Sequence, residues 1–335
     1  APPAERLAHR PGPPVKPPDG HARLGDAARP LQYTLDLHLD PDADLLRGEA
    51  QITVALAAAT PHLRLHGEGL RVHRATARAP GAEPVELQPV LGQHGALRLD
   101  APRPLPAGTL RLDLAWTSPV GKVPEGLYGV EADDARYLFT QFEPLGARRA
   151  FPCFDEPGFK APFSVSVRAP RGCTVLANTA AVGRRADGDD LVWVFEESPP
   201  LPTYLVAFAV GPFDVVEADP TLTPVPLRVI TTRGRGRLAR YALQITPRLL
   251  KALEAWSGVP YPYGKLDLVG VPDFAAGAME NVGLITFRER LLLLDAERAP
   301  MHDRMWAEIV IAHELAHMWF GNLVTMAWWD ELWLN

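Results

Sequence analysis

The chain has 335 residues, of which 47% are hydrophobic and 22% charged, and its formal net charge is −6. This composition is typical of a folded protein with room for two domains, and it excludes a disordered chain. A mildly acidic chain without long Lys or Arg runs also argues against nucleic acid or an anionic membrane surface as a partner.

The first residues form a Pro-rich segment. Residues 1–20 contain seven prolines and lack the apolar stretch of a signal peptide, so we expect a leader or linker over 1–22. Such a segment favours an exported protein, periplasmic or secreted, and leaves a cytoplasmic location open. Because no apolar run approaches the roughly 18 residues of a spanning helix, no transmembrane segment is expected.

The sequence that follows shows the alternating pattern of half-buried strands. Apolar and polar residues alternate over 33–39, 50–56 and 110–114. Short apolar runs separated by Pro, Gly and Asp clusters continue to about Phe213. Cys153 and Cys173 are too few for a disulfide framework and are expected to be unpaired core thiols. We therefore predict an all-β domain over residues 23–216.

The periodicity changes after a last strand over 226–232. Residues 238–256 place apolar side chains at helical spacing, and Gly258 is well suited to end that helix. This change predicts a second domain over 217–335.

Two further helices are expected near the end of the chain. Asp303 can cap a helix over 305–320, which Gly321 would end. Asp330 could cap another helix beginning at Glu331. That last helix has only its first turn in this sequence, so we expect the second domain to be incomplete.

The most informative motif is His313-Glu314-Leu315-Ala316-His317. Two histidines at i and i+4 lie on one face of a helix and can bind Zn²⁺ through neutral imidazole nitrogens. Glu314 can then take a proton from a metal-bound water and pass it to the leaving amine. The alternative is a buried amphipathic helix in which these polar side chains bond to one another.

A second motif, Gly277-Ala278-Met279-Glu280-Asn281, stands upstream. Together with the histidine motif it resembles the M1 (gluzincin) zinc aminopeptidases, and the resemblance extends through residues 29–33, 140–144, 147–157 and 202–208. It implies an α+β multidomain fold, with a saddle-shaped β domain followed by a truncated thermolysin-like catalytic domain. It also implies a metallo-aminopeptidase that uses one Zn²⁺ per chain to hydrolyse the N-terminal residue from peptides.

The resemblance assigns two amine anchors. An aminopeptidase must recognise a free α-ammonium, and a carboxylate in a partly dry site does so by charge-assisted hydrogen bonds. Glu280 and Glu143 map onto the glutamates that serve this purpose in the family. Gln141 maps onto the first side-chain pocket, where a neutral amide predicts neutral or broad specificity.

The remaining residues of the second motif are assigned to substrate binding in the same way. Gly277 and Ala278 are expected to form an extended edge that aligns the substrate backbone, because small residues permit close approach. A simple turn is the alternative. Met279 and Asn281 are included as members of the motif.

Other conspicuous residues are expected to be structural. The aromatic residues of the C-terminal part are predicted to pack in the core around the zinc helix; they are Trp319, Phe320, Trp328, Trp329 and Trp333. The acidic pair Asp155 and Glu156 is predicted to serve as a helix cap or in a salt bridge between domains.

The sequence departs from the family pattern in one respect. A catalytic zinc needs three protein ligands, and this chain supplies His313 and His317. In the family the third ligand is a glutamate that would directly follow Asn335, and Glu331 lies too early to replace it. The oxyanion-stabilising tyrosine of the family would also lie later. We therefore expect the chain by itself to be inactive, with apolar surface exposed over 327–334.

Two other functions remain to be distinguished from a zinc aminopeptidase acting on peptides with a free N-terminus. One is an endopeptidase of thermolysin type, which the amine anchors disfavour. The other is a catalytically incompetent protein that only binds peptides. We expect a monomer in each case.

Overall fold

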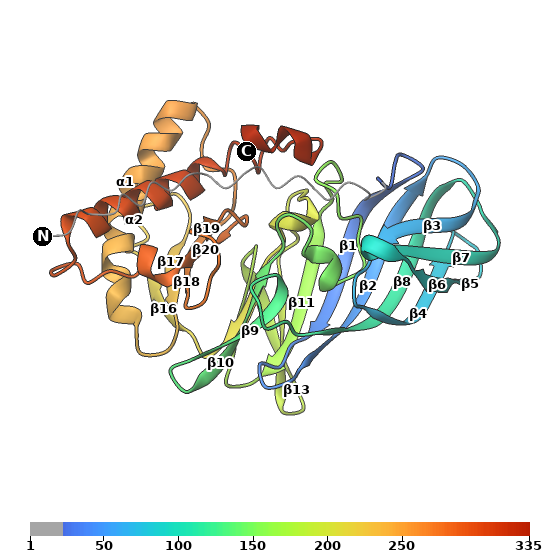
Figure 1. The fold of residues 1–335 in the computed structure, drawn as a ribbon, viewed down its shortest axis with the longest axis horizontal. Helices are drawn as coiled ribbons and strands as arrows, with labels where there is room; N and C mark the ends of the chain where they lie inside the picture. The colour runs from blue at the N-terminus through green and yellow to red at the C-terminus, as the bar shows by residue number, and fades with distance from the viewer. Residues whose placement is uncertain (1–22) are drawn as a thin grey trace, which may run out of the picture.

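The computed structural model describes residues 23–335, and the Pro-rich leader expected over 1–22 lies outside them. The described chain is β-rich up to Thr231, and its two α-helices follow that strand. Figure 1 shows the two parts side by side, with the long strands in one and both helices in the other. The predicted α+β multidomain class is confirmed.

An eight-stranded sheet forms the largest layer, in the order β13-β14-β11-β1-β2-β8-β4-β5. Its neighbours are antiparallel except β1 and β11, which are parallel. The predicted alternation is confirmed, because Leu35, Ile52 and Leu112 are fully buried on its inner face. The strands are β1 (Ala28–His38), β2 (Leu45–Leu56), β4 (Arg71–Arg78), β5 (Val85–Glu86), β8 (Gly108–Pro119), β11 (Phe163–Pro170), β13 (Ala181–Asp187) and β14 (Asp190–Phe195).

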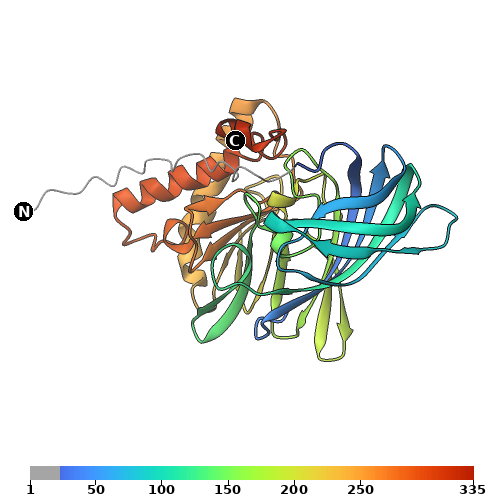
Figure 2. The ribbon, with the colours of Figure 1, turned by 45° about the vertical axis from the view of Figure 1, so that its right-hand side comes forward.

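Two smaller sheets complete the β-rich part, and their arrangement is seen best in Figure 2. One has the order β3-β7-β6 and the other β12-β15-β10-β9. Their strands are β3 (Thr60–His66), β6 (Gln88–Leu91), β7 (Ala96–Leu105), β9 (Gly126–Ala132), β10 (Ala135–Gln141), β12 (Thr174–Ala177) and β15 (Phe208–Gly211). Both cysteines are free, Cys153 in the core and Cys173 only partly buried.

The C-terminal part is built on a five-stranded mixed sheet in the order β16-β17-β18-β20-β19. Its strands are β16 (Asp214–Glu217), β17 (Leu227–Thr231), β18 (Leu266–Val271), β19 (Ala278–Met279) and β20 (Leu284–Arg288). The sheet therefore begins at Asp214, slightly before the domain boundary that we placed after residue 216. The short strand β19 lies at one edge of this sheet and is antiparallel to β20.

Helix α1 (Arg240–Ser257) follows the sequence prediction closely. It ends at Gly258, whose φ of 69° is in the left-handed region that glycine adopts without strain. A glycine at this position therefore favours the end of the helix, and it can be recognised from the sequence alone.

Helix α2 (Met301–Ala316) differs from its prediction at both ends. It begins directly after Pro300, and Asp303 lies in its first turn without capping it. It ends at Ala316. Beyond this residue the α-helical bonding pattern gives way to backbone hydrogen bonds that reach back five residues, such as the bond from the backbone N–H of Asn322 to the carbonyl of His317. The expected end at Gly321 was wrong.

The last element is a 3₁₀ helix, Trp329–Leu334, instead of a helix that begins at Glu331. The residue before it is Trp328, in an extended conformation, and no side chain caps the first turn. The expected cap at Asp330 was therefore wrong.

Side chains from the β-rich part hold the C-terminal part in place. Lys160 donates from Nζ to the carbonyls of Asn322 and Leu323, at 2.9 and 3.1 Å. Asn178 donates to the carbonyl of Val282 at 2.8 Å, deep in the interface. Both contacts reach segments close to the predicted site, so the two parts together determine its geometry.

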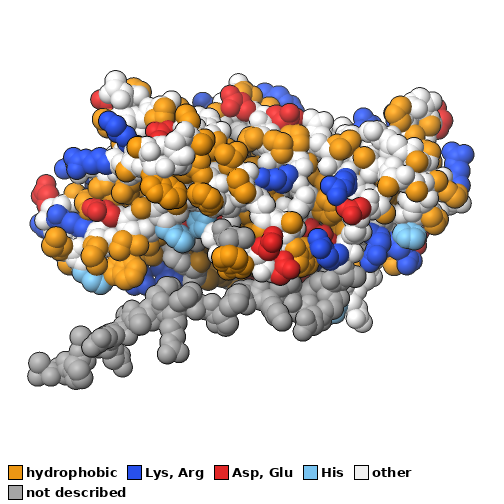
Figure 3. Space-filling view, turned by 90° about the horizontal axis from the view of Figure 1, so that it is seen from above, with side chains coloured by type: hydrophobic (Ala, Val, Ile, Leu, Met, Phe, Trp, Pro, Cys, Tyr) orange, Lys and Arg blue, Asp and Glu red, His pale blue; other side chains and the backbone are white. Residues whose placement is uncertain are grey.

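On the face seen in Figure 3, acidic and basic side chains are interspersed, so neither sign of charge dominates it. None of the described helices has the length and apolarity required to span a bilayer.

Candidate active site

The C-terminal end of α2 brings the two motif histidines together. His313 and His317 are separated by one helical turn, and their Nε2 atoms lie 3.1 Å apart. Two nitrogens bound to one tetrahedral zinc at 2.0–2.1 Å would be about 3.3 Å apart. The observed separation therefore fits a shared metal ion.

The protonation of the histidines also suits a metal. His317 Nδ1 lies 3.1 Å from the Phe320 carbonyl oxygen. Because a carbonyl only accepts, Nδ1 carries the proton and Nε2 keeps its lone pair for a metal. His313 is more exposed, and partial burial together with the neighbouring His317 lowers the pKa of its imidazole. The lowered pKa of His313 favours its neutral imidazole, which is the form that binds zinc.

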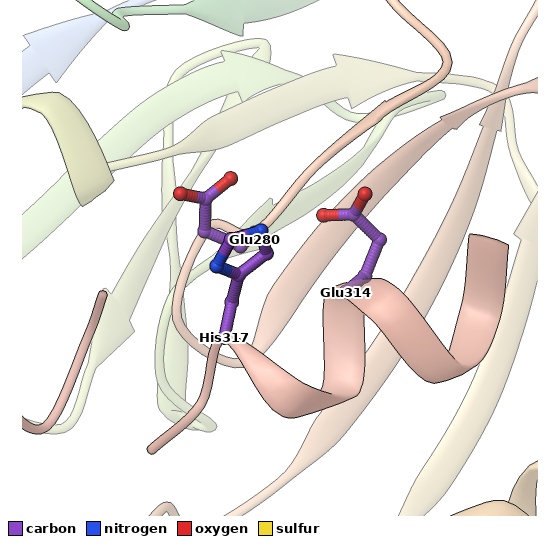
Figure 4. Close-up of side chains that lie close together, drawn as sticks. All are labelled: Glu280, Glu314 and His317. Atoms are coloured by element: carbon purple, nitrogen blue, oxygen red, sulfur yellow. The ribbon is translucent and has the colours of Figure 1, made fainter. Parts of the chain in front are cut away.

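Two carboxylates lie beside the histidines. Ligand atoms of Glu280, Glu314 and His317 are all within 4.8 Å of one another. Figure 4 shows Glu314 and His317 rising from the end of α2, with Glu280 reaching in from a neighbouring segment. Glu314 Oε2 is buried and has no hydrogen-bond partner among the described residues. Burial, followed by the charges of Glu280 and Glu143, raises the pKa of Glu314 well above its usual value.

The β-rich part contributes Gln141 and Glu143 from the end of β10. Burial and then the nearby charge of Glu280 raise the pKa of Glu143 to about 8. Gln141 donates weakly to the Glu143 carbonyl at 3.5 Å, and its Oε1 is buried without a partner among the described residues. Carboxylates from both parts of the molecule thus converge on one region, and no Lys or Arg among residues 23–335 contributes to the raised pKa of Glu143 or Glu314.

The edge strand β19 carries the second motif. Gly277 and Ala278 are partly exposed at this edge, and the Gly277 carbonyl is bonded to the Arg288 amide of β20. Met279 and Asn281 are buried to within 1% exposure, and the Asn281 amide donates to Thr286. Both side chains thus pack within the fold beside the site, and their assignment to substrate binding stays a prediction.

Three site residues were not identified from the sequence. Asn322 donates from Nδ2 to the Glu280 carbonyl, and Asn335 donates from Nδ2 to Glu280 Oε1, each at 2.8 Å. The Tyr204 hydroxyl donates to the Gly321 carbonyl at 3.2 Å. Tyr204 lies in a segment that supported the family resemblance, whereas no sequence signal distinguished the two asparagines.

The five aromatic residues predicted to lie in the core divide into three groups, of which one is Trp328, only partly buried against the core. Trp319 and Trp329 are buried, and Trp329 packs edge-on against Tyr204, which confirms their predicted core role. Phe320 and Trp333 are 51% and 78% exposed, so the core prediction was wrong for them. Phe320 packs only against the exposed ring of Trp256 among the aromatic contacts of the described residues, with 6.2 Å between the ring centroids.

The remaining acidic candidates lie outside the site. Asp155 forms a fully buried ion pair with Arg148, with Nε to Oδ2 at 2.8 Å. Glu156 pairs with Arg23 near the start of the described chain. Both are structural, although neither caps a helix nor bridges to the C-terminal part. Glu331 is exposed and does not join the metal-binding group found among residues 23–335.

Comparison with known proteins gives a consistent picture. The family model described as Peptidase M1 N-terminal domain matches residues 29–205, and that described as Peptidase family M1 domain matches residues 241–335. Aminopeptidase M1-D of Oryza sativa subsp. japonica is 39% identical over 94% of this chain and 36% of its own length. Aminopeptidase M1 of Arabidopsis thaliana is 36% identical over 94% of this chain and 37% of its own length. Endoplasmic reticulum aminopeptidase 1 of Homo sapiens is 36% identical over 93% of this chain and 34% of its own length. The chain thus spans about a third of the length of the curated relatives it matches.

Proposed function

Because the chain belongs to peptidase family M1, we propose that the whole protein is a zinc aminopeptidase that removes N-terminal residues from peptides. One observation carries this proposal: Glu143 and Glu280, from different parts of the molecule, lie close to each other and to the motif histidines, and no cation in the described part of the chain offsets the raised pKa of Glu143. A free α-ammonium is the substrate group that such a pair of carboxylates would recognise.

The residues of this chain have distinct roles in the proposed reaction. His313 and His317 would hold the zinc through Nε2. Bound zinc would lower the pKa of a coordinated water to about 7 and polarise the scissile carbonyl. Glu314 accepts the proton of the attacking water at its carboxylate and delivers it to the leaving amine nitrogen.

Substrate placement falls to the other site residues. Glu280 and Glu143 accept hydrogen bonds from the α-ammonium, which limits cleavage to the first residue. At the outer edge of β19, Ala278 offers backbone groups to an extended peptide, and Gly277, whose carbonyl is bonded to β20, permits close approach of that peptide. Gln141, with its buried and unpartnered Oε1, faces the first side chain as a neutral amide and favours broad specificity.

The proposal requires a third protein ligand for the zinc. Glu331 is exposed and separate from the histidines, so it does not supply this ligand in the described structure. We propose that a residue following Asn335 in a protein of the relatives' length supplies it, together with a donor to the oxyanion. The 335-residue chain alone is then expected to bind zinc weakly and to be inactive.

The test compares two fluorogenic substrates with a zinc-loaded protein of the relatives' length. We expect cleavage of leucyl-7-amido-4-methylcoumarin and a loss of at least about a hundredfold for its N-acetyl form, because acetylation removes the charge that the carboxylates bind. Equal cleavage of both would reject the amine anchors. Zinc binding without cleavage of either would support a protein that only binds peptides.

A further inference from the structure

Two asparagines hold Glu280, one of the two proposed amine anchors. Asn335 Nδ2 donates to Glu280 Oε1, and Asn322 Nδ2 donates to the Glu280 carbonyl, both at 2.8 Å. The Asn335 contact fixes the carboxylate, whereas the Asn322 contact fixes only the backbone. Asn335 directly follows the short helix Trp329–Leu334, remote in sequence from Glu280, which directly follows β19.

The surroundings of Asn335 define its orientation. An ionised carboxylate can only accept hydrogen bonds, so the Asn335 amide must turn its NH₂ group toward Glu280. Its Oδ1 is then directed at Gly321, where an added Cβ would lie 2.2 Å from Oδ1 and 3.2 Å from His317 Nδ1. Gly321 also has a φ of 116°. A glycine at this position thus leaves the space that the Asn335 side chain occupies beside the histidine.

We propose that Asn335 is a positioning residue that orients the Glu280 carboxylate toward the substrate α-ammonium. This inference rests on the proposed aminopeptidase function. A neutral amide suits this purpose because it bonds to Oε1 of Glu280 and adds no charge, so Oε2 remains available to accept from the ammonium. The effect of Asn335 is therefore exerted on binding of the amine and not on the metal.

The experiment uses a protein of the relatives' length with Asn335→Ala and Asn335→Leu, of which the second keeps the side-chain volume. Asp330→Ala, at an exposed position of the same short helix, is the matched control. Three quantities are measured: KM and kcat for leucyl-7-amido-4-methylcoumarin, zinc content per chain, and the affinity of the zinc-free protein for L-leucinamide by calorimetry.

We expect both Asn335 variants to raise KM about tenfold and to weaken leucinamide binding about tenfold, while kcat and zinc content stay within about twofold. The control should match the parent. If either folded variant retains KM and leucinamide affinity within twofold, the inference is overturned. It is also overturned if zinc content and kcat fall while leucinamide affinity is unchanged, because Asn335 would then act at the metal. Failure of the parent protein to distinguish leucyl from N-acetyl-leucyl substrate would instead reject the proposed function.

Discussion

Gly283 packs tightly against the backbone of Asn178, where the two parts of the molecule meet. A Cβ at this residue would lie 2.2 Å from the backbone oxygen of Asn178. The φ of Gly283 is 65°, in the left-handed region. Its own carbonyl is held by the Lys265 ammonium and the Asp267 amide, so the loop has little freedom to move away. We therefore expect Gly283→Ala to be strongly destabilising.

The expected loss of unfolding free energy in Gly283→Ala has two separate contributions. A non-glycine residue in the left-handed region costs roughly 1–2 kcal/mol. Relief of the clash requires Asn178 to shift by most of an ångström, and its side chain makes 2.8 Å hydrogen bonds with Leu205, Val282 and Ala207. Losing two of these buried bonds costs about 1 kcal/mol each. The sum is about 3–4 kcal/mol of unfolding free energy.

Two other glycines separate these contributions in a urea denaturation experiment. Gly188 has a φ of 62° with nothing within 4 Å of an added Cβ, so Gly188→Ala measures backbone strain alone. Gly172 has neither strain nor close neighbours, and its alanine variant should lie within about 0.5 kcal/mol of the parent. If Gly283→Ala costs no more than Gly188→Ala, the interface at Asn178 is looser than the structure indicates and the reasoning is refuted.

Three further changes test the site and the core. Glu314→Gln should lower kcat by roughly 10²–10⁴ with zinc content unchanged; a parallel loss of zinc would contradict a proton-transfer role. His317→Ala should weaken zinc binding by more than about a hundredfold, since losing even an outer partner of a ligand costs 10–100-fold; metal analysis after dialysis measures this. Asp267 is buried between Lys265 and Arg228. Burial raises its pKa, but the two cations outweigh burial and leave that pKa below its usual value. Its contribution to stability is therefore present above its unfolded pKa of about 3.9 and is lost as pH falls through the lower folded value. Urea midpoints from pH 5 to 2 should fall less steeply in Asp267→Asn than in the parent, and identical slopes would contradict this assignment.

The sequence predicted those features that are local. The end of α1 was found because Gly258 adopts a conformation that other residues resist. The buried faces of β1 and β2 were found because alternation has a fixed period of two. The approach of His313 to His317 was found because residues four apart share a helix face.

Features set by tertiary contacts could not be predicted in this way. Helix α2 begins after Pro300 and ends at Ala316. Beyond its end, the carbonyls of Gly321 and Asn322 accept hydrogen bonds from Tyr204 and Lys160 of the β-rich part. Asn335 and Asn322 reach Glu280 only through folding, and an asparagine in a sequence carries no sign of its partner. Phe320 and Trp333 look like core residues by composition, yet both are exposed.

The convergence of Glu143, Glu280 and Glu314 is electrostatically unfavourable in the absence of a bound cation. Burial and the neighbouring carboxylates raise the pKa of Glu143 to about 8 and hold that of Glu314 well above its usual value. Such an arrangement is maintained where a cation relieves it, and a substrate ammonium together with a metal would do so. Glu143 comes from the β-rich part and the other two from the C-terminal part, so the packing of the two parts, to which the Asn178 contact with Val282 contributes, brings these carboxylates together. The interface is therefore expected to be part of the binding machinery and not merely a place where two parts of the molecule meet.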